Sequence, residues 1–114
     1  MVKFYQEAFG WDQTVDSDIY VEFCLPGGSR VGLYERTAFG VNTDEVPVNI
    51  PKGALSPTEL YLSAEDPEQT MESLRTAGAR LLSPFRARSW GDAAAYYADP
   101  EGNVIAIASA SPAC

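Results

Sequence analysis

The residues best suited to chemistry in this sequence are acids, tyrosines and tryptophans, because the chain contains no histidine. Without an imidazole, a serine–histidine–aspartate triad cannot form, and the commonest nitrogen ligand of transition metals is absent. The two cysteines, Cys24 and Cys114, lie far apart, and no base is evident to activate Cys24. We therefore expect Cys24 to be buried and inert, and we predict no catalytic residue and no conventional transition-metal site.

Aromatic residues near the end of the chain are candidates for ligand contact. Trp90, Tyr96 and Tyr97 could stack on a planar molecule, with the indole N–H and the hydroxyls as polar handles. Core packing is the alternative use of these rings, and the sequence leaves both open. Arg86 and Arg88 precede Trp90 and could meet an anionic group, although surface ion pairing is the commoner use of such side chains.

Apolar periodicity predicts the elements that position these residues in the first part of the chain. Residues 4–9 have a helical spacing, and residues 11–15 are expected to form a strand. Strict alternation over 19–25, a turn containing proline and glycine, and a returning strand over 30–35 predict a hairpin. Residues 37–58 show no clean period and predict an unstructured linker that could serve as a lid.

The second part of the chain repeats this pattern with one addition, a strand over 58–63 ahead of its helix. Asp66 and Pro67 are a strong helix start, and Gly78 is a typical helix end. Further strands are expected over residues 80–88, 94–98 and 104–108. The order αβββ then βαβββ predicts one α+β domain in which helices cover one face of a curved mixed sheet and the other face is concave. We divide it into module one (1–36), the linker (37–58) and module two (59–108), with the first strand of module one absent.

Composition excludes several partners. The net charge is −8, and no basic stripe is present to neutralise phosphates, so neither nucleic acid nor an anionic membrane is an expected partner. No apolar run approaches the ~20 residues that cross a bilayer, and the N-terminus lacks the apolar segment of a secretory signal. The scattered cysteines fit a reducing compartment, so we expect a cytoplasmic protein.

Four segments in order resemble motifs of the vicinal oxygen chelate superfamily, which includes glyoxalase I, extradiol dioxygenases, fosfomycin-modifying enzymes and bleomycin-resistance proteins. Residues 4–11, FYQEAFGW, resemble the family's FYxxxLGW helix end, and residues 77–80, AGAR, its second helix end. Trp90-Gly91 and residues 96–105, YYADPEGNVI, resemble its WG…YFxDPxGNxI tail. The resemblance implies two βαβββ modules around a cup.

In enzymes of this superfamily a divalent metal sits in the cup, held by histidine or glutamate on the first and last strands of each module. Carried over to this chain, the first ligand would precede Met1, and the others fall at Gly32, Glu59 and Ala106. Only Glu59 could coordinate a metal, and one carboxylate does not hold a catalytic ion. The resemblance therefore implies a member that uses no metal and no other cofactor.

The same strand alternation assigns side chains to the cup. The predicted ligand-binding residues are Tyr20, Glu22, Tyr34, Glu59, Tyr61, Trp90 and Tyr96. Glu59 could act as a general base or pair with a cation, or it could be a solvated carboxylate at a strand end. The aromatic rings favour a planar or aromatic ligand, neutral to cationic, and pairing of one acid with Arg30 would favour a neutral one.

We expect a small-molecule-binding protein similar to the bleomycin-resistance proteins, which sequesters an antibiotic or an aromatic metabolite without changing it. One alternative is a divalent-metal-dependent lyase, isomerase or dioxygenase with an atypical metal site, and another is a dimeric module with a vestigial cup. Because module one lacks a first strand, its sheet has an uncovered edge, and we expect a homodimer that covers it.

Overall fold

The structure is a computed structural model, and it describes residues 1–109. The first half contains α1 (Val2–Phe9) followed by the strands β1 (Asp12–Asp16), β2 (Tyr20–Cys24) and β3 (Arg30–Tyr34). The strands form an antiparallel sheet in the order β1-β2-β3, with β2 in the centre. We call this sheet A.

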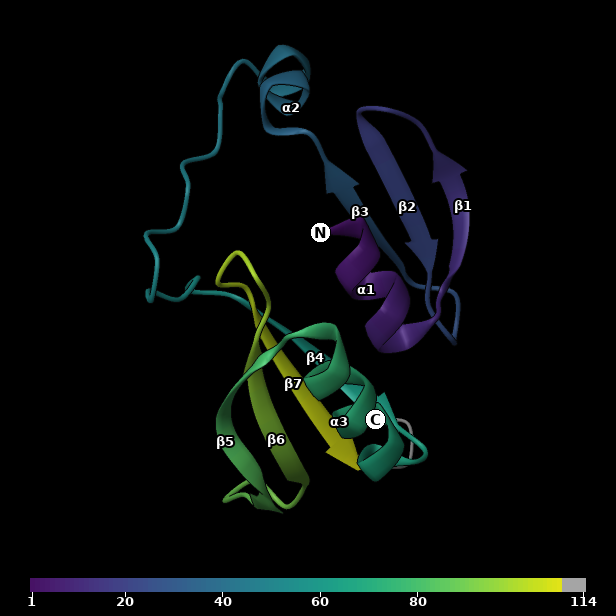
Figure 1. Ribbon diagram of the computed structural model, residues 1–114, viewed down its shortest axis with the longest axis vertical. Coiled ribbons are helices and arrows are strands. Elements are labelled where there is room, and N and C mark those ends of the chain that lie inside the picture. Colours follow the sequence, from purple (N-terminus) through teal and green to yellow (C-terminus); the bar gives the residue numbers. More distant parts are fainter. Residues whose placement is uncertain (110–114) are drawn as a thin grey trace.

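The second half adds the strand that the first half lacks among the described residues. It consists of β4 (Glu59–Ala64), α3 (Pro67–Ala77), β5 (Arg80–Ala87), β6 (Ala93–Ala98) and β7 (Val104–Ser109). This sheet B has the order β4-β7-β6-β5, in which β4 runs parallel to β7 and the other pairs are antiparallel. The predicted α+β class is confirmed, and the strands lie in two separate sheets (Figure 1).

Local signals in the sequence account for the ends of the helices. α1 ends at Gly10, which has the left-handed φ of 65° that suits a residue without Cβ. At the start of α3, the Asp66 carboxylate accepts a hydrogen bond from the Gln69 N–H at 3.2 Å, and Pro67 takes the first helical position. These boundaries agree with those predicted from the sequence.

The expectation of an unstructured segment over 37–58 is wrong for its first third. Residues Arg36–Thr43 form a short helix, α2, whose N-terminus is capped by the Glu35 carboxylate accepting from the Ala38 N–H at 2.9 Å. No residue of α2 is buried, and Gly40 interrupts its apolar pattern, so the helical period is weak in the sequence. Beyond its cap, the contact of Phe39 with Tyr34 and the ion pair of Arg36 with Glu101 connect the helix to the two halves.

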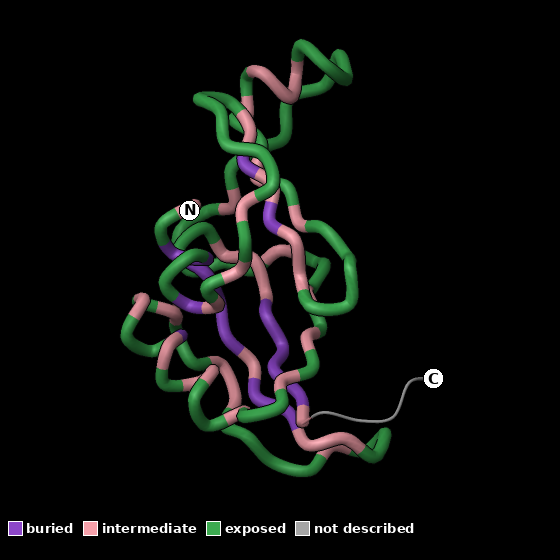
Figure 2. The backbone as a smooth tube through the Cα atoms, turned by 90° about the vertical axis from the view of Figure 1, so that its right-hand side faces the viewer, coloured by how far each residue is buried: buried purple, intermediate pink, exposed green. Residues whose placement is uncertain are grey.

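The core lies between the helices and one face of each sheet. α1 packs against α3, and both lie in front of the sheets in Figure 1. The largest fully buried side chains come from both halves: Tyr5, Phe23, Leu74, Ile105 and Ile107. In Figure 2 the buried stretches run through the middle of the molecule, whereas the end that carries α2 is mostly exposed. The opposite face of sheet A is therefore open, whereas on the opposite face of sheet B the alanines Ala94, Ala106 and Ala108 are buried as well.

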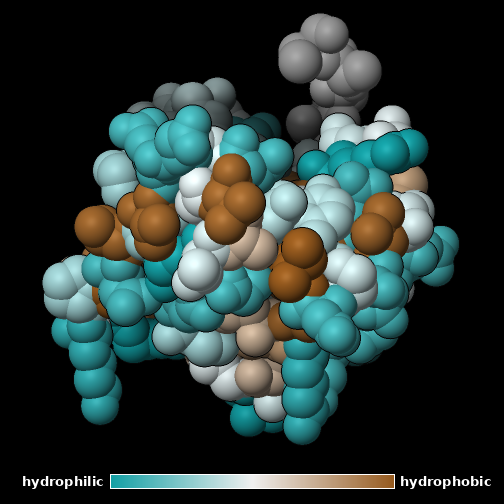
Figure 3. Space-filling view, turned by 90° about the horizontal axis from the view of Figure 1, so that it is seen from above, coloured by the Kyte–Doolittle hydropathy of each residue, from teal (hydrophilic) through white to brown (hydrophobic). Residues whose placement is uncertain are grey.

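The linker after α2 contacts the turn between β6 and β7. The Ser56 N–H donates to the Gly102 carbonyl at 2.8 Å, and a Cβ at Gly102 would lie only 2.8 Å from the Ala54 carbonyl oxygen. Val41, Val46 and Val48 on α2 and the linker are exposed, and the view from above shows separate apolar side chains among hydrophilic ones (Figure 3). Among residues 1–109, no helix is long and apolar enough to cross a membrane.

Candidate functional site

Burial alternates along β2 as the sequence predicted. Val21 and Phe23 are buried toward the helices, so Tyr20, Glu22 and Cys24 project from the open face of sheet A. Cys24 is half-buried there rather than fully buried, because the strand alternation places it on the open side. The assignment of tyrosine and glutamate side chains to this face thus agrees with the structure.

The Glu22 carboxylate is held by residues from all three strands of sheet A. It accepts hydrogen bonds from the hydroxyls of Thr14 at 2.8 Å and Tyr20 at 2.9 Å, and it pairs with the Arg30 guanidinium at 3.3 Å. These hydrogen bonds, chiefly that from Thr14 and then that from Tyr20, hold the pKa of Glu22 below its usual range. The hydrogen bond that Tyr20 donates to Glu22 also raises the pKa of the Tyr20 hydroxyl. The Glu22 carboxylate is therefore ionised, and its negative charge is already balanced by the Arg30 guanidinium.

The ring of Tyr20 lies over Gly32, which pairs with Glu22 and is the diagonal neighbour of Tyr20 on β3. A Cβ placed on Gly32 would come within 2.4 Å of the Tyr20 hydroxyl oxygen and 2.6 Å of a ring carbon. Position 32 is where the family resemblance implies a metal ligand, so a histidine or glutamate there would displace Tyr20. In this chain an aromatic ring fills that place.

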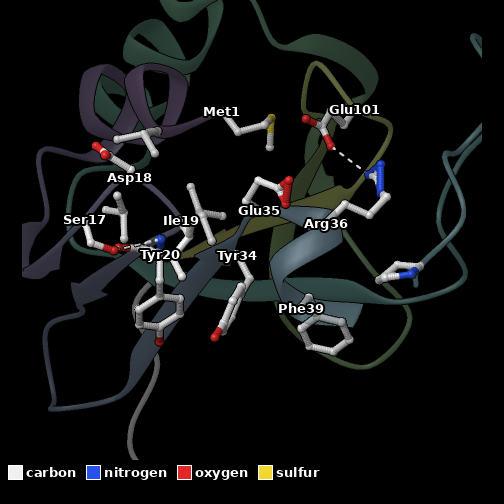
Figure 4. A pocket seen from close by; sticks show the side chains of 14 residues that line it. Met1, Ser17, Asp18, Ile19, Tyr20, Tyr34, Glu35, Arg36, Phe39 and Glu101 are labelled. Carbon is white, nitrogen blue, oxygen red and sulfur yellow. Dashed lines mark hydrogen bonds and ion pairs between the residues drawn. The ribbon is translucent and has the colours of Figure 1, made fainter. Parts of the chain in front are cut away.

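Three aromatic rings adjoin one another on the open face of sheet A. The ring centroids of Tyr20 and Tyr34 are 5.0 Å apart, and those of Tyr34 and Phe39 are 5.7 Å apart. Figure 4 shows all three rings pointing to the same side of the chain. We call these residues the aromatic strip. Phe39 was missed in the sequence because its helix was interpreted as linker, and no local pattern assigns a direction to its side chain.

A second polar and aromatic group lies on sheet B. The Tyr61 hydroxyl donates to Asp92 Oδ2 at 2.7 Å and accepts from the Trp90 indole N–H at 3.0 Å. Donation by Trp90 lowers the pKa of Tyr61, but the bond to Asp92, with partial burial, outweighs it and raises that pKa. Trp90 remains 56% exposed. The structure thus joins two of the predicted residues, Tyr61 and Trp90, through Asp92, which sequence reasoning missed.

The Arg88 side chain binds groups of the hairpin between β5 and β6. Its guanidinium lies 4.9 Å from the centroid of the Tyr96 ring and donates to the Ser83 hydroxyl and to the carbonyls of Pro84 and Ala94. The two expectations for Arg88, an anion contact and a surface ion pair, are therefore replaced by a structural role. Tyr96 is on the open face beneath it, whereas Tyr97 is in the core.

The predicted residues do not share one cavity. Tyr20 and Tyr34 line a cavity of about 570 Å³, Tyr61 lines one of about 670 Å³, and Glu59 and Tyr96 line one of about 370 Å³. None of the three is lined by Glu22 or Trp90. The structure therefore groups the predicted residues by sheet, where a single cup was expected.

The residues present do not fit a divalent metal. Among residues 1–109, no group of three or more histidine, cysteine, aspartate or glutamate side chains could hold an ion. Gly32 is covered by Tyr20, and Ala106 is fully buried opposite Tyr61 in the β4–β7 register. Glu59 is exposed and makes no ion pair with a described residue. One carboxylate on its own cannot fix the coordination that a catalytic ion needs.

The comparisons with known proteins agree with the observed fold. Residues 1–108 match the family model described as glyoxalase-like domain. A glyoxalase-related enzyme from Fulvimarina pelagi is 22% identical with a TM-score of 0.79, over 96% of this chain and 77% of that one. A glyoxalase/bleomycin resistance protein/dioxygenase family enzyme from Burkholderia phytofirmans PsJN is 22% identical with a TM-score of 0.75, over 96% and 87%. A glyoxalase/bleomycin resistance protein/dioxygenase from Nocardioides is 19% identical with a TM-score of 0.73, over 99% and 78%.

At these identities the structural likeness shows the fold alone. No curated protein matches the chain significantly.

Proposed function

Because the chain belongs to the glyoxalase-like domain family of the vicinal oxygen chelate superfamily, we propose that it binds a planar aromatic small molecule without a metal. The ligand stacks on the aromatic strip of Tyr20, Tyr34 and Phe39 and is held without being chemically changed. Sequestration of an antibiotic or aromatic metabolite is the biological role that this binding would serve.

The observation that carries the proposal is the continuity of the aromatic strip on an open sheet face. Tyr34 is 38% exposed, and its ring lies between that of Tyr20, tilted by 49°, and that of Phe39, edge-on at 76°, so a planar ligand that stacks on one ring also meets the edge of a neighbouring ring. Aromatic pairs contribute about 0.5–1.5 kcal/mol beyond the burial of their area. The hydroxyls of Tyr20 and Tyr34 supply polar contacts at the edge of the strip.

The charges at the Tyr20 end of the strip favour a neutral ligand over a cationic one. Glu22 is the acid nearest to Tyr20, and its carboxylate is already satisfied by two hydroxyls and by Arg30. A cation at this face would compete with Arg30 for Glu22 and would gain little in exchange. We therefore narrow the ligand class at the strip to neutral planar molecules.

The metal-dependent alternative differs in what it requires of residues 32 and 106. A lyase, isomerase or dioxygenase of this superfamily would need side chains that reach an ion from those positions, and Gly32 and Ala106 provide none. Ligand binding should thus be indifferent to chelators, whereas the alternative requires that chelation abolish it.

Thermal denaturation with neutral planar probes, namely indole, 2-naphthol and coumarin, tests the proposal. A probe present at about 100 times its Kd stabilises the folded state by about 2.7 kcal/mol and raises Tm measurably. Tyr34→Ala should weaken probe binding by about 1 kcal/mol, close to fivefold in Kd. Val41→Ala, which removes an exposed side chain (82%) outside the strip, is the matched control and should leave Kd unchanged. Equal Kd values in the parent and in Tyr34→Ala would contradict binding at the strip.

A further inference from the structure

Basic side chains gather around a cavity where the linker meets the turn between β6 and β7. This cavity of about 830 Å³ is lined by Arg36 on α2, Lys52 on the linker and Arg80 at the start of β5, and we call it the linker cavity. These are three of the eight basic residues of a chain that has 16 acidic ones. Two acids, Asp99 and Glu101, line the same cavity. Positive charge is therefore in excess here, although negative charge is in excess over the whole chain.

Lys52 and Arg80 have no partner for their charge among residues 1–109. Neither makes an ion pair or a side-chain hydrogen bond, and of the other basic residues in this range only Arg86 shares that property. Arg36 pairs with Glu101 at 3.6 Å, and its Nε atom is buried without a partner. The linker cavity thus holds donor groups that the described part of the protein does not use.

The two acids of the linker cavity already have partners elsewhere. Asp99 is only 4% exposed, and its carboxylate accepts hydrogen bonds from the Tyr5 hydroxyl and from N–H groups of its own turn. Glu101 pairs with the guanidinium of α2, as the dashed line in Figure 4 shows. Because neither acid pairs with Lys52 or Arg80, these two charges are free to meet a ligand.

Contacts on both sides of Lys52 hold the linker against the rest of the cavity. Ahead of it, the Asn49 side chain accepts a hydrogen bond from the Arg36 guanidinium. After it, a backbone hydrogen bond of 2.9 Å closes the turn formed by residues 51–54. The end of this turn lies against Gly102, where a Cβ would come within 2.8 Å of the last carbonyl oxygen of the turn. Lys52 is therefore carried by a segment that is fixed at two points.

We propose that the linker cavity binds a small molecule that carries a phosphate monoester. Its three cations come from a helix, the linker and a strand, and a phosphate offers them three terminal oxygens and a charge of about −1.5 to −2. A carboxylate has only two oxygens and a single charge, so it cannot meet all three equally well. Val48 and Ile50 add apolar surface for the organic part of the ligand, and the volume is typical of small-molecule sites. The linker cavity shares no residue with the aromatic strip.

Calorimetric titration with glycerol 3-phosphate, in a phosphate-free buffer of constant ionic strength, tests the proposal. About one molecule should bind per chain, with inorganic phosphate and succinate binding more weakly. Lys52→Gln and Arg80→Gln should each raise Kd about fivefold or more, because each removes a charged donor. Arg86→Gln is the matched control and should leave Kd unchanged. It removes the same charge from an exposed and unpaired residue of β5 that does not line the cavity.

An equal loss of affinity in Arg80→Gln and Arg86→Gln would overturn the proposal, because the ligand would then respond to overall charge and not to this site. Absence of binding by both glycerol 3-phosphate and inorganic phosphate would overturn it as well. Succinate bound as tightly as glycerol 3-phosphate would contradict the assignment to a phosphate. The three substituted side chains are exposed, so each variant should keep the parent Tm without a probe. Since glycerol 3-phosphate has no planar ring, its binding is independent of the aromatic strip.

Discussion

Gly32 leaves room for the Tyr20 ring on the open face of sheet A, because it has no side chain. The atoms nearest to a Cβ at this position belong to the far end of the Tyr20 side chain, which can move without disturbing the backbone. Gly32→Ala should therefore push Tyr20 away from Glu22, break the strip and weaken neutral aromatic probes by about 1 kcal/mol, with little loss of stability. Calorimetric titration and Tm measurement check both parts.

Gly40→Ala is the matched control for this change. A Cβ at Gly40 would meet the Val46 side chain, with the Val46 Cβ and Cα at 3.5 and 3.6 Å, so it would shift this part of the linker, which lies outside the strip, and leave Tyr20 in place. Probe affinity should remain at the parent value in Gly40→Ala. Loss of affinity in both variants, or in neither, would count against the role assigned to the Tyr20–Gly32 contact.

The Glu22 carboxylate should give the fold a pH dependence of definite sign. Its pKa is lowered in the folded state, so its contribution to stability is present above the unfolded-state pKa and is lost as the pH falls through the folded-state pKa. Glu22→Gln removes this contribution at neutral pH. The Tm of the variant should lie below that of the parent at pH 7, and the gap should close as the pH is lowered past the ordinary pKa of glutamate. A gap that stays constant over this range would show that Glu22 is not coupled to folding.

At the scale of elements, a buried hydrogen bond links the two halves. The Tyr5 hydroxyl on α1 donates to Asp99 Oδ2 at 2.6 Å, and Asp99 also accepts from the Glu101 and Asn103 N–H groups and the Asn103 side-chain amide. Burial, followed by this bond, raises the pKa of Tyr5 far above its ordinary value. The DPEGN segment, which carries much of the family resemblance, thus holds a turn and anchors α1.

Tyr5→Phe should destabilise the protein by about 2 kcal/mol, because it removes a hydrogen bond to a buried carboxylate. Tyr97→Phe serves as the control, since Tyr97 is buried in the same core cluster and makes no hydrogen bond with a described residue. Urea denaturation gives both free energies of unfolding. If the two substitutions cost the same, the Tyr5–Asp99 bond is not the anchor between the halves.

The elements that sequence reasoning placed correctly are those with local signals. Gly10, Asp66 and Gly78 mark helix ends through their own backbone preferences, and the alternation over 19–25 fixes which side chains of β2 face the helices. α2 was not predicted, because its apolar residues are too few and too scattered to give a helical period, although its cap is formed by a residue next to it in the sequence. The bond between Tyr5 and Asp99 joins residues 94 positions apart, so no local pattern could indicate it.

The sequence could predict which face of its strand each site residue points to, but not which of these residues lie together. Strand alternation placed Tyr20, Glu22, Tyr34 and Tyr61 on the open faces, and the structure agrees. Their division between two sheets depends on how the halves pack, which involves contacts between distant residues. Asp92 and Phe39 lie in a loop and a short helix, where neither alternation nor helical period assigns a direction.

At the scale of the whole molecule, the chain is a glyoxalase-like domain in which the Tyr20 ring lies over Gly32, and the central proposal is that the aromatic strip binds its ligand without a metal. The most direct test is calorimetric titration of 2-naphthol into protein treated with a chelator, repeated after addition of Zn²⁺, Ni²⁺, Mn²⁺ or Fe²⁺. The account predicts binding of about one probe per chain with the same Kd in every case, and recovery of the probe unchanged. Binding or turnover that appears only when one of these ions is present would contradict it.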